Sequence, residues 1–187
     1  QVPDSLRFVA VGGAAVPAPP FAFLQATQDG EAVLVDAVRP AIEGARVWAD
    51  LFSGLGTFAL SLGGGKRTYA AEAARDMVLA LKSAGNHSGR QLAVDHRDLF
   101  RRPLVTEELD RFEAVLLDPP RAGAREQAAQ IARSRVPSVA YVSCNPSSFA
   151  RDAKTLVEGG YVLESVKPVG QFRWSTHVEL AAIFRRP

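Results

Sequence analysis

From residue 46 onward, short apolar runs with a strand-like composition alternate with segments of helical periodicity. This alternation is typical of βαβ units around a mainly parallel sheet. The apolar runs predict seven strands, at 46–50, 67–71, 91–95, 114–118, 138–143, 161–168 and 178–184. The periodic segments predict helices at 56–62, 72–86, 123–135 and 147–158.

The two ends of this pattern differ from its middle. The last two predicted strands are joined by a loop without a helical pattern, so we expect an antiparallel pair at the sheet edge. Ahead of the sheet, residues 7–25 are rich in Gly, Pro and small residues, and 29–43 reads as an amphipathic helix. We therefore expect a pre-sheet segment at 1–44 and an α/β domain at 45–187, with helices on both faces of the sheet.

Composition narrows the class of protein. At 187 residues, the chain has about the length of one domain. A net charge of +2 permits a phosphate-rich partner without demanding one. The single cysteine excludes an internal disulfide, and no Cys and His stand at zinc-site spacing. With no membrane-length apolar run and no signal-peptide pattern, we expect a cytoplasmic protein without a metal. Because the chain begins at Gln1 and not at Met, we expect a piece of a longer protein.

A glycine turn follows the first predicted strand, in the stretch DLFSGLGTF at 50–58. Gly54 and Gly56 let the backbone turn sharply and approach a ligand closely. A third glycine, usual in a dinucleotide-binding turn, is replaced by Ala59. Asp50, at the end of the strand, suits an amine or a water better than a diphosphate. The alternative is an ordinary tight connection without a ligand.

Two further carboxylates follow the next two strands. Glu72 stands about twenty residues after the glycine turn, where a carboxylate can accept hydrogen bonds from both hydroxyls of a ribose. This position suits either a nicotinamide cofactor or S-adenosylmethionine. Asp98 is placed to receive an adenine amino group, or alternatively to cap the next short helix.

The candidate chemistry lies after the fourth and fifth strands and at the start of the last. Asp118 is followed by two prolines, which make the backbone rigid where open α/β sheets bind ligands. Cys144 precedes a helix N-terminus, which is expected to lower the pKa of its thiol, although a lone cysteine is more often a small buried residue. Glu179 can face the same rim, or be a solvated glutamate in a hairpin.

Taken in order, the motifs DLFSGLGTFAL, LLDPPRAG, YVSCNPSSFARD and STHVE resemble the RNA 5-methyluridine methyltransferase family. The resemblance runs over nearly the whole chain and includes Phe23-Leu24-Gln25 as the family's Phe-x-Gln segment. It implies the class I methyltransferase fold, a Rossmann-like sheet with a parallel core and an antiparallel edge pair. A dehydrogenase sheet is disfavoured by the same edge pair.

The resemblance also implies roles for individual residues. Cys144 would be the nucleophile that attacks carbon 6 of uridine, and Glu179 the general base that removes the proton from carbon 5. The resemblance implies two roles for Asp118, as a cofactor contact and as a residue that orients the base. The expected S-adenosylmethionine contacts are Gln25, Phe52, Thr57, Glu72, Asp98 and Asp118.

Three positions depart from the family's pattern. Thr27 stands where the family has Asn, which is expected to weaken one cofactor contact. Ser53 replaces a common Cys, and Gly170 replaces a common Asp in the loop that leads to Glu179. The family's extra RNA-binding domain and the iron-sulfur cysteines of some members do not occur in this sequence, so we expect a missing N-terminal RNA-binding domain.

RNA is the expected partner, with ribosomal RNA favoured over transfer RNA by the SCNPSSFARD and Trp174 to Glu179 segments. We expect the uridine to be flipped out of its stack. The candidates for stacking on it are Phe149, Phe172 and Trp174. The candidates for phosphate contacts, which a solvated helix face explains equally well, are Arg121, Arg125, Arg133, Arg135, Arg151 and Arg173.

Other readings stay open beside this one. A cytosine-5 methyltransferase would use two cysteines, and this chain has one. A nicotinamide-dependent oxidoreductase is disfavoured by the incomplete glycine pattern. A non-catalytic RNA-binding module that has kept the fold would have little reason to retain Asp118, Cys144 and Glu179 together.

Overall fold

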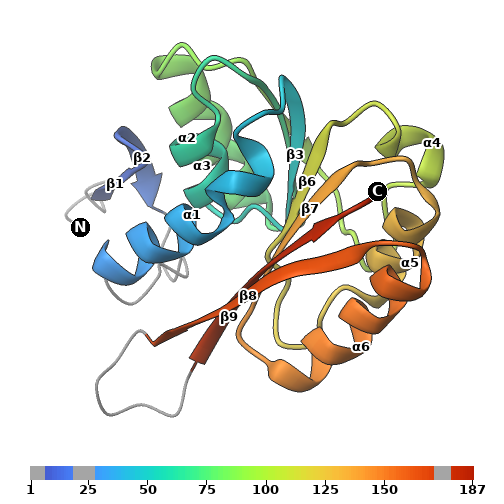
Figure 1. The fold of residues 1–187 in the computed structure, drawn as a ribbon. Helices are drawn as coiled ribbons and strands as arrows, with labels where there is room; N and C mark the ends of the chain where they lie inside the picture. The colour runs from blue at the N-terminus through green and yellow to red at the C-terminus, as the bar shows by residue number, and fades with distance from the viewer. Residues whose placement is uncertain (1–6, 19–27, 171–177) are drawn as a thin grey trace.

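The computed structural model describes residues 7–18, 28–170 and 178–187. Its main feature is a seven-stranded sheet in the order β5-β4-β3-β6-β7-β9-β8 (Figure 1). The strands are β3 (Val47–Leu51), β4 (Arg67–Glu72), β5 (Leu92–His96), β6 (Ala114–Leu117), β7 (Ser138–Ser143), β8 (Val162–Gly170) and β9 (Val178–Arg185). Strands β3 to β7 are parallel, and β9 runs antiparallel to both β7 and β8. The predicted α/β class, strand count and antiparallel edge pair are confirmed.

Helices cover both faces of the sheet, as expected (Figure 1). One face packs against α1 (Gln28–Ile42), α2 (Thr57–Leu62) and α3 (Arg75–His87). The other packs against α4 (Thr106–Leu109), α5 (Arg125–Arg133) and α6 (Pro146–Glu158). Side chains alternate between the faces along each strand, so Trp48 and Ala49 enter different core clusters. None of these helices is both long and apolar enough to cross a membrane.

A two-stranded hairpin that the sequence analysis missed lies beside α2 and α3. It consists of β1 (Arg7–Val11) and β2 (Ala14–Ala18), which pair antiparallel across Gly12 and Gly13. Both glycines have positive φ, at 54° and 77°, as a two-residue hairpin turn requires. Arg90 fixes this turn, because its Nη2 donates to the carbonyl of Gly12 at 2.8 Å. Buried Val11 and Val16 join the same core cluster as Leu60 and Leu81.

The connectivity creates a switch point in the sheet. From β3 the chain proceeds through β4 to β5 on one side, and then crosses to β6 and β7 on the other. In open α/β folds, the loops diverge at such a point and leave a crevice beyond the carboxyl ends of the strands. The expected site residues follow these strand ends.

Candidate functional site

A cavity of about 460 Å³ lies beyond the carboxyl ends of β3 to β7. This volume is within the range of roughly 300–1,000 Å³ that small-molecule sites occupy. Seven of the eight residues predicted from the sequence line it, namely Phe52, Thr57, Glu72, Asp98, Asp118, Cys144 and Glu179. The eighth, Gln25, lies outside the described residues.

The glycine turn forms one wall of the cavity. Phe52, directly after β3, has a positive φ of 64°, which is rare for a residue with a side chain and is found mainly at functional sites. Gly56 has φ 88° and begins α2, and a Cβ placed there would lie 2.3 Å from Cδ1 of Leu81. Glycine at 56 is therefore required both by the backbone conformation and by the close approach of α3.

The side chain of Asp50 stabilises the glycine turn. Its side chain is fully buried, and its Oδ2 accepts a hydrogen bond from the amide of Ala59 at 2.9 Å. Burial raises the pKa of Asp50 to about 7, the Ala59 hydrogen bond opposes that rise, and the charge of Glu72 adds to it. Oδ1 accepts no hydrogen bond from the part of the chain that the structure describes.

Glu72 joins the glycine turn to the loop after β4. Its Oε2 accepts from the amide of Gly54 at 2.9 Å, and its Oε1 accepts from the amide of Ala74 at 2.8 Å. Since each carboxylate oxygen can accept two hydrogen bonds, both retain a free acceptor position for a ligand hydroxyl. Glu72 thus has a structural role that the sequence did not reveal, beside the role predicted for it.

Asp98 stabilises the turn after β5 that places Phe100 at the cavity. Its Oδ1 accepts from the amides of Phe100 at 2.9 Å and Arg101 at 3.4 Å, and so caps a turn instead of a helix. The ring of Phe100 contacts that of Phe52, with centroids 5.4 Å apart, and Phe100 remains 49% exposed. These two rings give the cavity an apolar wall beside the carboxyl of Asp98.

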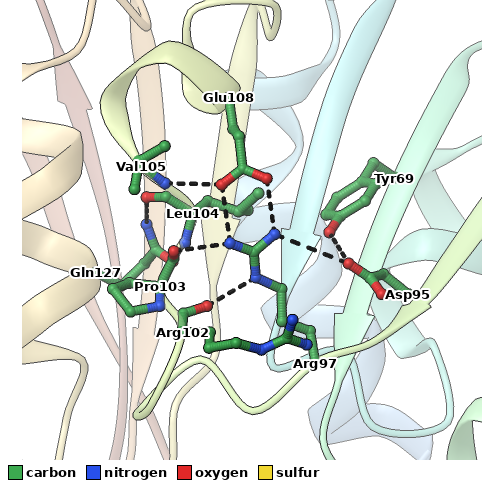
Figure 2. A network of polar contacts seen from close by, with 9 residues as sticks. All are labelled: Tyr69, Asp95, Arg97, Arg102, Pro103, Leu104, Val105, Glu108 and Gln127. Atoms are coloured by element: carbon green, nitrogen blue, oxygen red, sulfur yellow. Dashed lines mark hydrogen bonds and ion pairs between the residues drawn. The ribbon is translucent and has the colours of Figure 1, made fainter.

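The contacts of Arg97 fix the loop that carries Asp98 and Phe100 (Figure 2). It forms a two-point ion pair with Glu108, with Nη1–Oε1 and Nη2–Oε2 distances of 2.8 Å. Nε also donates to the carbonyl of Arg102 at 2.7 Å, and Nη2 to that of Pro103 at 2.9 Å. The side chain is only 13% exposed. Sequence reasoning missed Arg97 because its partners lie in the loop at Arg102 and Pro103 and on the short helix α4, neither of which carries a motif.

The opposite end of the cavity combines Asp118, Cys144 and Glu179. Asp118 continues β6, and its amide donates to the carbonyl of Leu51 at 3.2 Å. Cys144 directly follows β7. In the antiparallel pairing Leu180 is opposite Ser143, so Glu179, the second residue of β9, lies at the level of Cys144. The register of two strands thus brings together residues that are 35 positions apart in the sequence.

Burial and mutual repulsion govern the ionisation of these groups. The pKa of Asp118 is raised well above its ordinary value by burial, then by the charges of Glu179 and Asp50. The pKa of Cys144 is also raised, by burial first and then by Glu179 and Asp118, while its backbone and Arg121 act in the opposite direction. The sequence-based expectation of a lowered thiol pKa was therefore wrong for this cavity, because burial and two carboxylates outweigh the helix N-terminus.

The structure shows which of the candidates for RNA contact are buried, which are paired with carboxylates and which lie at the cavity. Phe149 is 8% exposed and packs edge-on against Tyr141, so it is a core residue and not a stacking platform. Phe172, Arg173 and Trp174 lie outside the described residues. Arg135 is paired with Asp110 and Arg151 with Asp152. Arg121, in contrast, lines the cavity.

A family model and relatives of similar sequence indicate one family. A family model described as tRNA (Uracil-5-)-methyltransferase matches residues 70–186. An uncharacterized RNA methyltransferase of Zymomonas mobilis is 58% identical over 178 residues, which are 95% of this chain and 45% of the relative. A 23S rRNA (uracil(1939)-C(5))-methyltransferase of Alteromonas mediterranea is 38% identical over 139 residues, 73% of this chain and 29% of the relative.

A solved structure shares the fold. The tRNA (uracil-54, C5)-methyltransferase of Pyrococcus abyssi, in complex with S-adenosyl-L-homocysteine, superposes with a TM-score of 0.82 at 25% identity. The match covers 95% of this chain and 44% of the other. This chain therefore spans less than half the length of each of these three relatives.

Proposed function

Because the chain belongs to the tRNA (uracil-5-)-methyltransferase family, we propose that it transfers a methyl group from S-adenosylmethionine to carbon 5 of a uridine in RNA. The observation that carries this proposal is the single cavity shared by the Glu72 and Asp98 carboxyls at one end and by Asp118, Cys144 and Glu179 at the other. We infer that this cavity, of about 460 Å³, takes the cofactor at the first end and the target base at the second.

The residues at the first end fit the proposed cofactor. Glu72 retains acceptor positions for ribose hydroxyls, and the carboxyl of Asp98 can accept from an adenine amino group. Phe52 and Phe100 offer apolar surface to a flat ring. Thr57, at the first position of α2, and Gln25 complete the proposed set of contacts. When bound, S-adenosylmethionine supplies an electrophilic methyl group.

The residues at the second end suit covalent catalysis. Carbon 5 of uracil is a poor nucleophile until a nucleophile adds to carbon 6. The Cys144 thiolate forms the bond to carbon 6, and the electron pair displaced to carbon 5 and the O4 carbonyl makes carbon 5 reactive. After methylation, Glu179 removes the proton from carbon 5, and the sulfur–carbon 6 bond breaks to return the thiolate.

Asp118 is proposed to orient the uracil. Its carboxyl lines the cavity with Cys144, and its pKa is raised by desolvation and by the charges of Glu179 and Asp50, which makes the protonated form more accessible. A protonated carboxyl can both donate and accept a hydrogen bond. A uracil edge offers both an N–H donor and carbonyl acceptors, so a neutral carboxyl is complementary to it. The rigid Pro119 and Pro120 that follow keep this carboxyl in place.

We propose ribosomal RNA as the target. The 38% identity to a relative named as a 23S rRNA methyltransferase supports this choice, as does the motif at 143–152. The Pyrococcus abyssi structure belongs to an enzyme named for transfer RNA, so transfer RNA is the comparison substrate in any assay.

The test uses RNA that contains 5-fluorouridine, because fluorine in place of the carbon 5 proton blocks the last step. Incubation with S-adenosylmethionine should give a methylated covalent adduct, detected by intact mass and mapped to Cys144. The chain has no other cysteine, so the site of attachment is unambiguous, and Cys144→Ala is the matched control. Absence of the adduct, despite measured binding of RNA and cofactor, would show instead a non-catalytic RNA-binding module.

A further inference from the structure

The loop that follows β6, at residues 118–124, is held by side chains of a neighbouring helix. Nδ2 of Asn145, the cap of α6, donates to the carbonyl of Arg121 at 2.9 Å. Nη2 of Arg151 donates to the carbonyl of Ala122 at 2.9 Å. The amide of Ala124 donates to Oδ2 of Asp152 at 2.6 Å. The first two turns of α6 thus bind three backbone groups of one short loop.

Asp152 is the centre of this arrangement. It is fully buried, and its Oδ2 also accepts from the hydroxyl of Tyr141 at 2.6 Å. Its Oδ1 accepts from Nε of Arg151 at 2.8 Å, which compensates the buried charge. One carboxylate therefore connects α6 with the loop through Ala124 and with β7 through Tyr141, three residues before Cys144.

Gly123 shows how closely the loop approaches the helix. Its φ is +78°, and a Cβ placed there would lie 2.5 Å from Nη2 of Arg151 and 2.6 Å from Oδ2 of Asp152. Its amide closes the turn by donating to the carbonyl of Pro120 at 2.8 Å. The backbone that follows Arg121 is therefore fixed against the Arg151–Asp152 pair, and the turn from Pro120 to Gly123 is closed by its own hydrogen bond.

These contacts also fix two residues of the cavity relative to each other. Arg121 lies on the held loop and Cys144 lies directly after the strand that Asp152 binds, and both line the cavity. We propose that Asp152 is a positioning residue that holds the guanidinium of Arg121 beside Cys144, where its positive charge supports the thiolate. The assignment rests on the proposed function in one respect only, because the proposed methyl transfer is the reaction that requires the thiolate.

The charges around Cys144 explain why a nearby cation affects the ionisation of its thiol. Glu179 from β9 and Asp118 from the end of β6 both disfavour the thiolate, as does burial. Arg121 is a cationic side chain that acts against them, together with a backbone hydrogen bond at Cys144. Displacing the Arg121 loop would weaken this opposition to the two carboxylates, because the interaction between charges falls as they separate.

The test is the pH dependence of alkylation of Cys144 by iodoacetamide, measured without RNA or cofactor. We expect Asp152→Asn to move the midpoint upward by about 0.5 pH unit, a roughly threefold loss of thiolate near neutral pH. Arg121→Met should produce a similar shift. In the double variant the two shifts should not add, since both act through the same charge.

Two further variants keep the outcome interpretable. Asp110→Asn breaks the ion pair with Arg135 on the surface and should leave the midpoint unchanged. Asn145→Ser retains a helix cap but loses the donor to Arg121, so it should shift the midpoint upward even if Asp152→Asn fails to fold. Circular dichroism establishes which variants are folded.

An unchanged midpoint in folded Asp152→Asn and Asn145→Ser, or fully additive shifts in the double variant, would overturn the assignment. The result is independent of the 5-fluorouridine experiment. A shifted midpoint without an RNA adduct would refute the proposed methyl transfer and leave the positioning role of Asp152 intact. An adduct with an unshifted midpoint would do the reverse.

Discussion

The guanidinium of Arg97 and the carboxylate of Glu108 meet at two points, and both nitrogen–oxygen distances are 2.8 Å. The pair spans the loop that carries Asp98 and Phe100, so it joins the two ends of this loop (Figure 2). Arg97, Asp98 and Phe100 line the cavity, whereas Glu108 does not. The cavity side chains of this loop thus depend on a contact with a residue outside the lining.

Replacing Arg97 with lysine should weaken cofactor binding. Lysine cannot reproduce the two-point contact with Glu108 or the bonds to the Arg102 and Pro103 carbonyls. We expect the Kd for S-adenosylhomocysteine to rise roughly tenfold, about 1.4 kcal/mol, in isothermal titration calorimetry. Arg135→Lys, which changes an exposed pair with Asp110, is the matched control. An unchanged Kd together with a lowered Tm would show that Arg97 acts on stability alone.

Asp50 should make stability depend on pH between about 4 and 7. Its pKa is raised from 3.8 to about 7 in the folded state, so the folded chain binds more protons than the unfolded chain in this window. Stability contributed by the protonated form is therefore lost as pH rises through about 7. Asp50→Asn removes this titration while it keeps an acceptor for the Ala59 amide. Urea unfolding at pH 5 and pH 8 should show a smaller pH effect in the variant, and equal effects in both proteins would contradict the prediction.

A methyl group at Gly56 should destabilise the fold through both strain and collision. Gly56→Ala forces an alanine to φ 88° and places its Cβ against Leu81, and we expect a loss of about 2 kcal/mol or more. Gly65, at φ 70°, has open space around its Cβ position, so Gly65→Ala should lose only about 1 kcal/mol. The difference between the two in urea unfolding isolates the contribution of the collision, and equal losses would mean that Leu81 moves aside freely.

Removing the proposed base should separate the two halves of the reaction. In Glu179→Gln the thiol can still attack and the methyl can still be transferred, but the carbon 5 proton has no acceptor. We expect ordinary uridine RNA to accumulate as a methylated adduct on Cys144, visible by mass spectrometry, with turnover reduced by roughly 100-fold or more. Cys144→Ala should form no adduct. Normal turnover in Glu179→Gln would remove Glu179 from its proposed role.

The larger strands and helices were predictable because their signals are local. Every strand of the large sheet was predicted within two residues of its observed ends, since long apolar runs bounded by turn residues leave few alternatives. The β1–β2 hairpin was missed, although Gly12-Gly13 between apolar residues is a recognised turn signal. Helix α4 was also missed, because its four residues are too few for a periodic pattern.

The sequence predicted which residues form the site, but it did not predict how burial and charge affect their ionisation. The described side chains named from the motifs share one cavity, because strand ends converge at one edge of a parallel sheet. Their proposed roles stay predictions. The thiol pKa was misjudged because its direction depends on how deeply Cys144 is buried and on where Glu179 and Asp118 lie, which only the folded register determines. Arg97 and Asp152 were overlooked as positioning groups for the same reason.

The position of β9 bears on the order in which the cavity is completed during synthesis. Among the described residues, those proposed to hold the cofactor all precede residue 119, whereas Glu179 lies on the last strand in chain order. That strand inserts between β7 and β8, and β8 has its only described pairing with β9. On the ribosome, the cofactor end of the cavity is therefore made first. Glu179, the proposed proton acceptor, arrives only when β9 joins β8 to the rest of the sheet.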